Sequence, residues 1–267
     1  MIYIIFSFFQ NYWMGGENEY LHKMKEMQIT AHRGGAAHGI ENSLSAIERS
    51  LSIGSKSIEI DVHATKDGQV IVCHDSSVDR TTNGKGRIKD LLLSEIKQLK
   101  LKNKDGKISD ESIPTLDEVI KLINGKAELL IEIKPGNGEA DIENKVISII
   151  KDNHAEKTTV IQSFNDKVLE NVSLIDDTIP IEKLLFFKFP GLPLIFDGGI
   201  STFSLDKYKK VKSFNFYYPG LNKSLANKLH EKGKRIRIWT LDDKAKTPNY
   251  YLDGIITDDP DLFLREG

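Results

Sequence analysis

The chain has almost no cysteine, almost no net charge and no long apolar run. Among its 267 residues Cys73 is the only cysteine, so an internal disulfide is excluded, and its apolar neighbours predict a small buried side chain. Lysine and arginine total 37 against 39 acidic residues. The resulting net charge of -2 provides no overall positive electrostatic field that would attract nucleic acid or acidic membranes. An anionic ligand would therefore have to be bound by local groups.

The N-terminal segment is apolar and aromatic, but too short to cross a membrane. Residues 1–13 fall well below the roughly 20 apolar residues that a spanning helix needs, and a basic n-region and a clear cleavage site are both missing. We expect residues 1–27 to be an extension, disordered or weakly signal-like, ahead of one catalytic domain at residues 28–267. The expected location is cytoplasmic, with export as the alternative if residues 1–13 act as a signal. Membrane association and nucleic-acid binding are not expected.

From residue 28 onward, β-rich runs alternate with amphipathic stretches of helical period, a pattern typical of βα units and a parallel sheet. Eight strands with helices between them favour a closed (β/α)₈ TIM barrel, which about 250 residues suffice to build. An open doubly wound sheet is disfavoured because its glycine-rich fingerprint does not follow the first strand. The eight runs are Ile29–His32, Ser57–Val62, Leu129–Ile133, Thr159–Phe164, Lys183–Phe187, Ser213–Tyr218, Arg235–Leu241 and Gly254–Thr257.

Helix and turn signals support this pattern and locate an insertion after the second strand. Apolar spacing predicts helices ending near Gly54 and Gly233, and Thr115–Glu118 is a capping box that opens another. Lys66–Gly68 predicts a tight turn to an extra antiparallel strand ending at His74, which would bring His74 near Asp61. The rest of the insertion, about residues 75–112, is polar and predicts a small excursion over the mouth of the barrel.

Several strand ends are unusually polar for elements of a core. Glu59 and Asp61 are two residues apart and project to the same side of a strand, as do Glu132 and Lys134. The carboxyl ends of all barrel strands meet at one face, so three carboxylates would repel one another there unless a cation neutralised them. A hard divalent ion, Mg²⁺ or Ca²⁺, suits oxygen ligands. Exposed strand residues paired with lysines are the alternative, which the matching Glu132 and Lys134 pair disfavours.

Two histidines and two cations complete the predicted site. His32 and His74 each end an apolar strand beside a charged neighbour, and imidazoles suit acid–base chemistry on a phosphodiester near neutral pH. Arg33 could hold a phosphate by a bidentate fork and Lys134 as a point charge, while the glycines after Arg33 would let the backbone approach the ligand. Among the other histidines only His63 shares a face with the acidic residues.

Ten motifs in a fixed order resemble the glycerophosphodiester phosphodiesterase family, a distorted TIM barrel related in architecture to phosphatidylinositol-specific phospholipase C. Two positions depart from the family pattern, where Ile40 replaces a proline and Ser43 a threonine, and segment 180–203 matches poorly. The motifs are Ala31–Gly34, Glu41–Ser43, Glu59–His63, Lys66–Gly68, His74–Asp75, Ile113–Leu116, Glu132–Lys134, Gln162–Phe164, Trp239–Thr240 and Ile256–Asp258.

The resemblance implies a role for each matching residue. His32 and His74 would be the catalytic acid–base pair. A divalent metal would be bound by Glu59, Asp61 and Glu132. Substrate contacts would come from Arg33, Lys134 and Trp239. Glu41, Gln162 and His63 would contact these residues from outside the site. The resemblance also implies that the insertion after His74 is the family's small cap, which shapes the glycerol end of the pocket.

The implied reaction is hydrolysis of small glycerophosphodiesters, such as glycerophosphocholine, glycerophosphoethanolamine or glycerophosphoglycerol. It needs one divalent cation and releases sn-glycerol 3-phosphate and an alcohol, from a monomer or homodimer. A lysophospholipase D acting on lipid-bearing diesters is the alternative, with the aromatic segments 186–190 and 214–218 available to an acyl chain. A barrel that only binds a phosphorylated ligand is a third hypothesis, which the complete set of site residues disfavours.

Overall fold

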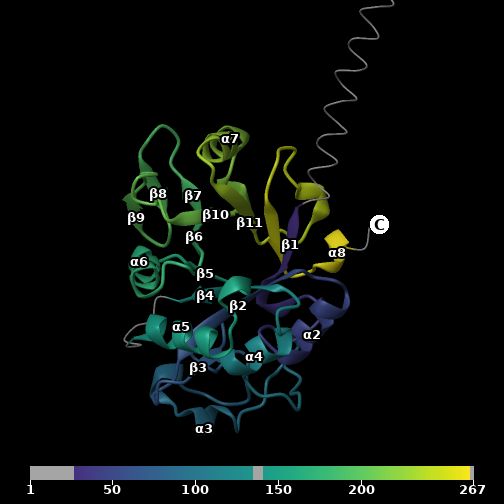
Figure 1. The fold of residues 1–267 in the computed structure, drawn as a ribbon. Helices are drawn as coiled ribbons and strands as arrows, with labels where there is room; N and C mark the ends of the chain where they lie inside the picture. Colours follow the sequence, from purple (N-terminus) through teal and green to yellow (C-terminus); the bar gives the residue numbers. More distant parts are fainter. Residues whose placement is uncertain (1–26, 135–140, 265–267) are drawn as a thin grey trace, which may run out of the picture.

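The computed structural model describes residues 27–134 and 141–264, and its centre is a closed barrel of eight parallel strands (Figure 1). The strand β1 closes the ring, because it pairs in parallel with the last strand on one side and with the second on the other. The predicted TIM barrel is therefore confirmed. Its strands are β1 (Gln28–Ala31), β2 (Ser57–Ala64), β4 (Glu128–Ile133), β5 (Thr159–Ser163), β6 (Ile181–Leu185), β10 (Val211–Tyr217), β11 (Arg235–Trp239) and β12 (Gly254–Thr257).

Helices connect the strands and cover the outside of the barrel. The predicted capping box opens its helix: the Thr115 hydroxyl accepts from Glu118 N, and the Glu118 carboxylate accepts from Thr115 N at 2.7 Å. The helices are α2 (Leu44–Ser52), α3 (Leu93–Ile96), α4 (Leu116–Ile123), α5 (Ile142–Asp152), α6 (Asp166–Ile175), α7 (Lys223–Glu231) and α8 (Asp261–Leu264). In the described part of the chain, none is long and apolar enough to cross a membrane.

Strand β2 shows how one strand serves both a core and a site. All eight of its residues are buried, as is usual for a strand inside a parallel barrel. The side chains of Ile58, Ile60 and Val62 belong to the main hydrophobic cluster together with residues of α2 and α4. Burial of each such side chain stabilises the fold by roughly 1.5–3 kcal/mol. The alternate positions, Glu59 and Asp61 among them, therefore point toward the barrel axis.

The predicted extra antiparallel strand is present but ends at Val72 rather than His74, and the insertion that follows it has a small core of its own. Strand β3 (Val70–Val72) pairs antiparallel with β2, and Gly68 turns the chain with φ +78°. Cys73 N then donates to Asp61 O at 2.9 Å, which brings the next residue, His74, beside the acidic strand. A separate hydrophobic cluster joins β3 to the insertion. Its buried members are Ile71, Cys73, Val78, Ile88, Ile96, Leu101 and Ile113.

The predicted fifth strand, Lys183–Phe187, is wrong at both ends. The barrel strand β6 ends at Leu185, and Phe187 starts a separate antiparallel sheet of β7 (Phe187–Lys188), β8 (Leu194–Phe196) and β9 (Ile200–Thr202), green at the upper left of Figure 1. The chain leaves the barrel because Phe186 N donates to Phe196 O at 2.9 Å and the rings of Phe187 and Phe196 stack. Apolar residues continue through both sheets, so hydrophobicity alone does not mark the boundary.

Four other predicted strands are one or two residues too long at their carboxyl ends: Ile29–His32, Thr159–Phe164, Ser213–Tyr218 and Arg235–Leu241. His32 belongs to a 3₁₀ turn at His32–Gly34, and β11 stops at Trp239 rather than Leu241. In both places the chain turns away from the barrel where its side chains meet the pocket.

Candidate active site

A cavity of about 190 Å³ opens at the carboxyl ends of the barrel strands. It brings together residues that lie more than 200 positions apart in the sequence, and all but one of the predicted catalytic, substrate and metal residues line it. The exception, Asp61, is fully buried behind the cavity wall. The lining residues are His32, Arg33, Glu59, His74, Glu132, Lys134, Gln162, Phe164, Leu184, Phe186, Trp239, Thr240 and Ile256.

Three buried carboxylates form the floor of this site. Glu59, Asp61 and Glu132 are at most 5% exposed, and one oxygen of each lies within 4.8 Å of the others. Burial and the charge of Asp61 raise the pKa of Glu59 to about 7, and burial also raises that of Glu132. This donor set fits a hard divalent cation, since an ion there would offset the repulsion that raises both pKa values.

Lys134 lies directly against two of these carboxylates. Its Nζ atom is 2.9 Å from Asp61 Oδ1 and 2.7 Å from Glu132 Oε1. Burial would raise the pKa of Asp61, but Lys134, His74 and Arg33 together outweigh burial and hold that pKa well below its usual range. Lys134 therefore faces both the cavity and the acidic floor.

The two predicted catalytic histidines have different electrostatic surroundings. His32 Nδ1 lies 2.6 Å from Asp258 Oδ1; burial lowers the pKa of His32, but this hydrogen bond and Glu59 outweigh burial and raise it. His74 Nδ1 lies 2.8 Å from Asp75 Oδ1, and here burial prevails over the charge of Asp61, so the pKa of His74 is lowered. In each ring Nε2 remains as the nitrogen available to a ligand.

Arg33 is held in an unusual conformation above the acidic floor. Its backbone is left-handed, with φ 49°, and its amide donates to Glu59 Oε2 at 2.9 Å. Its guanidinium lies 3.1 Å from Glu41 Oε1 and 3.7 Å from Asp61 Oδ2. Left-handed φ values are uncommon for residues other than glycine, so the surrounding contacts must fix Arg33 in place.

The glycines after Arg33 allow close packing against α2. A Cβ at Gly34 would lie 2.9 Å from Ile47 Cγ1, and one at Gly35 only 2.4 Å from Ser50 Oγ, so both glycines let this turn approach α2. Both also have positive φ. Close packing against the helix is therefore a reason for these glycines that the sequence did not indicate, and their predicted role in ligand approach stays a prediction.

Glu41 is bound by two arginines. Besides Arg33, Arg80 from the insertion donates to its two oxygens at 2.6 and 2.7 Å, and the same guanidinium binds Asp75 at 2.7 and 3.0 Å. Glu41 is thus absent from the three-carboxylate cluster. The four contacts of Arg80 link the insertion, the loop after β1 and the partner of His74.

Gln162 and His63 contact the site from behind. Gln162 Nε2 donates to Glu59 Oε1 at 3.2 Å, and its own carbonyl accepts from Asn215 Nδ2 at 2.9 Å. His63 Nε2 lies 3.3 Å from the carbonyl oxygen of His74. Both residues therefore contact predicted site residues, and Gln162 in addition lines the cavity.

The whole catalytic part of the chain matches known proteins. The profile of the glycerophosphoryl diester phosphodiesterase family covers residues 32–262. A glycerophosphodiester phosphodiesterase of Caldanaerobacter subterraneus is 36% identical over 243 residues, 89% of this chain and 96% of that protein. This chain belongs to the glycerophosphoryl diester phosphodiesterase family. It is accordingly an enzyme that hydrolyses phosphodiesters.

Further relatives agree with the family assignment and the fold. A glycerophosphodiester phosphodiesterase of Bacillus altitudinis is 30% identical, over 89% of this chain and 97% of its own. An Oleispira antarctica phosphodiesterase, solved in complex with the product sn-glycerol-3-phosphate, superposes with a TM-score of 0.77 at 23% identity and covers 88% of this chain and 94% of its own. A glycerophosphodiester phosphodiesterase from Agrobacterium tumefaciens superposes with a TM-score of 0.74 at 24% identity, and the match covers 89% of this chain and 99% of that one.

Sequence reasoning assigned no role to four residues that support this family's site. Asp258 binds His32, Arg80 binds Glu41 and Asp75, Asn215 binds Gln162, and Asn42 Nδ2 donates to Asp61 Oδ2 at 2.9 Å. Asn42 and Asp258 do stand inside the matching motifs, which was the signal available. Asn215 lies in a core strand and Arg80 in an exposed loop. Polar residues in such places do not by themselves indicate a functional site.

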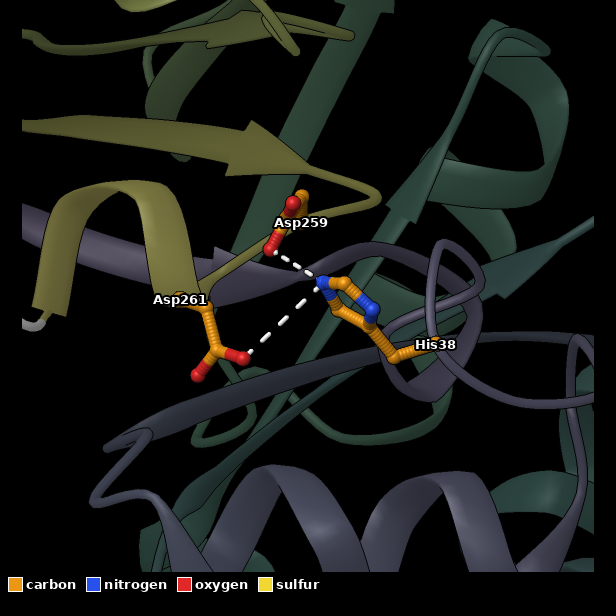
Figure 2. A group of neighbouring side chains, drawn as sticks. All are labelled: His38, Asp259 and Asp261. Atoms are coloured by element: carbon orange, nitrogen blue, oxygen red, sulfur yellow. Dashed lines mark ion pairs between the residues drawn. The ribbon is translucent and has the colours of Figure 1, made fainter.

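A second acidic group lies beside the loop that carries Asp258 (Figure 2). His38 Nε2 is 2.8 Å from Asp259 Oδ1 and 3.9 Å from Asp261 Oδ2, and Arg49 binds Asp261 at 2.6 Å. Ala37 N also donates to Asp258 O at 2.9 Å. Because His38 and Arg49 already pair with the two carboxylates, we interpret the group as a connection between the loops after β1 and β12.

Proposed function

We propose that this enzyme hydrolyses small glycerophosphodiesters to sn-glycerol 3-phosphate and an alcohol, with one divalent cation held by Glu59, Asp61 and Glu132. The single observation that carries the proposal is the cavity itself. The wall around its space of about 190 Å³ combines two carboxylates, with the third, Asp61, buried beside them, and it adds two basic side chains and two imidazoles whose pKa values shift in opposite directions. Such divergence is typical of acid and base partners.

The chemistry divides among these side chains. A bound cation would neutralise charge on the phosphate. Arg33 and Lys134 would hold the phosphate oxygens at the edge of the acidic floor. His74, with its lowered pKa, would accept the proton of the nucleophile, which is the glycerol hydroxyl or water. His32, kept protonated by Asp258, would deliver a proton to the departing alkoxide.

The test is release of sn-glycerol 3-phosphate from a panel of glycerophosphodiesters with choline, ethanolamine and glycerol headgroups. Release should stop after chelation and return when Mg²⁺ or Ca²⁺ is restored, and the more effective ion identifies the cofactor. Undiminished release after exhaustive chelation would contradict the metal assignment. The proposed reaction would be contradicted if the enzyme cleaved neither this panel nor bis-(p-nitrophenyl) phosphate, with Mg²⁺ and with Ca²⁺ alike.

A further inference from the structure

A second cavity, of about 300 Å³, lies between the loop after β1 and the insertion. It shares no lining residue with the active-site cavity. Four of its lining side chains are charged, and three of them are cations: Arg80, Lys102 and Lys104. The fourth is Glu41. This cavity, which we call the insertion pocket, is therefore a cationic hollow on a chain whose net charge is -2.

The one carboxylate of the insertion pocket is neutralised, whereas two of its cations are not. Arg33 lies 3.1 Å from Glu41 Oε1, and Arg80 donates to both oxygens of the same carboxylate. Lys102 Nζ donates to a backbone carbonyl at 2.8 Å, and Lys104 is exposed. Among the residues that the structure describes, neither lysine forms an ion pair. The pocket thus keeps a positive charge that an anion could offset.

Arg80 has one further donor to offer. A guanidinium carries five N–H groups. Four of those of Arg80 are used, two on Glu41 at 2.6 and 2.7 Å and two on Asp75 at 2.7 and 3.0 Å. The fifth, on Nη1, has no acceptor within residues 27–134 and 141–264, and the side chain is 49% exposed. Arg80 can therefore contact an anion in the pocket.

We propose that the insertion pocket binds a phosphate dianion, either a phosphate monoester or inorganic phosphate, and that its occupation slows the enzyme. A phosphate monoester carries a charge of about −1.5 to −2 at pH 7. A phosphodiester has one ionisable oxygen fewer and carries less charge. The cationic pocket therefore favours the monoester product over the diester substrate, an argument that rests on the proposed function.

Arg80 couples the insertion pocket to the reacting centre. It binds Asp75, and Asp75 Oδ1 lies 2.8 Å from His74 Nδ1. An anion held by Lys102, Lys104 and the fifth N–H of Arg80 would draw the guanidinium toward the pocket and weaken its hold on Asp75. His74 would then be less firmly oriented, and kcat would fall. Substrate binding would persist, because the anion lies outside the active-site cavity.

The kinetic experiment measures kcat and KM for glycerophosphocholine at rising inorganic phosphate or sn-glycerol 3-phosphate, with the free divalent cation held constant. At saturating substrate we expect either anion to lower kcat by about fivefold or more, a usual strength of coupling between two sites. Equal effects support a site for any phosphate dianion, and a stronger effect of sn-glycerol 3-phosphate supports a product site. A rise of KM with kcat unchanged would place the anion at the reacting centre and overturn the inference.

Substitutions of the two lysines locate the anion. Without added anion, the double variant Lys102→Gln, Lys104→Gln should keep kcat and KM within about twofold. It should raise the anion concentration that halves kcat by about tenfold or more, because two charged contacts are lost. Lys107→Gln is the matched control, since Lys107 lies in the same turn but does not line the pocket.

A single variant guards against a change of fold. Lys102 also binds the backbone at Asp79, so Lys104→Gln alone gives a second reading at an exposed position, with an expected rise of about two- to fivefold. Equal sensitivity to phosphate in the wild type, the single variant and the double variant would overturn the inference.

Titration calorimetry tests the insertion pocket without turnover. Inorganic phosphate titrated into the wild-type enzyme should show a binding event that the double variant lacks. Identical isotherms would overturn the pocket even if glycerophosphodiesters are cleaved. A lost event in the variant, in an enzyme that cleaves no diester, would support the pocket and contradict the proposed function.

Discussion

At the scale of single residues, the site depends on two imidazoles whose surroundings differ. We expect His32→Ala and His74→Ala each to lower kcat by at least ~100-fold with the fold retained, because each removes a positioned proton donor or acceptor. His154→Asn is a suitable control, since His154 has φ 53° and asparagine tolerates that conformation. Steady-state kinetics and circular dichroism check the result. Near-wild-type kcat in both alanine variants would contradict the acid–base assignment.

Asp258 determines the proton affinity of His32. Its hydrogen bond is the main contribution that raises the pKa of His32 against burial, so Asp258→Asn should lower that pKa. A general acid works only while protonated, and activity falls as pH rises through its pKa. The alkaline limb of the kcat profile should therefore move to lower pH in Asp258→Asn. A limb that stays in place, or moves to higher pH, would show that His32 is not the acid.

At the scale of elements, Arg80 connects the insertion to the barrel. It binds Glu41 and Asp75 at once, and Asp75 in turn binds His74, so the pKa of Asp75 is lowered to about 2, first by Arg80 and then by His74. We expect Arg80→Gln to lower kcat roughly 10- to 100-fold, because His74 loses its fixed partner. Arg80→Lys should recover part of the loss.

Arg87 provides the matched control for Arg80. It lies in the same insertion and pairs with the exposed Asp90, away from the cavity lining. Arg87→Gln should leave kcat and KM within about twofold, as expected for an exposed pair. Equal losses in both variants would mean that the insertion acts only through its stability.

At the scale of the whole molecule, a network of linked polar side chains runs along the barrel interior, from the amino-terminal end of β4 to the active site. Arg237, fully buried, binds Glu128 at 2.8 Å and Glu182 at 3.1 Å, and Asn215 connects Glu182 to Gln162. Gln162 in turn binds Glu59 of the acidic floor. The orientation of that carboxylate is therefore tied to the centre of the barrel.

Removing the positive charge of Arg237 from this network should destabilise the fold. We expect Arg237→Met to lower the free energy of unfolding by about 3–5 kcal/mol, because two carboxylates lose their buried partner. The double variant Arg237→Met, Glu182→Leu should be less destabilised than the single one. Urea unfolding followed by fluorescence measures both, with Arg235→Met, at a half-exposed position, as control. A single variant as stable as the wild type would show that the pair adds nothing to stability.

Much of the site follows from the sequence because it depends on local periodicity. Glu59 and Asp61 share a face for the same geometric reason in any strand, and the turn at Gly68 dictates that β3 returns His74 to Asp61. The parts that the sequence did not indicate depend on contacts between separate segments. The end of β6 is set by the pairing of Phe186 with Phe196, and the glycines after Arg33 pack closely against α2.

Periodicity, capping and turn chemistry, which are local properties of the chain, predicted the eight-stranded barrel and the residue types at the carboxyl ends of its strands. The side chains that support the histidines, and the way in which Arg80 joins the insertion to the site, could be read from the tertiary structure alone. Those features are distances between segments far apart in sequence, and such distances are fixed by packing.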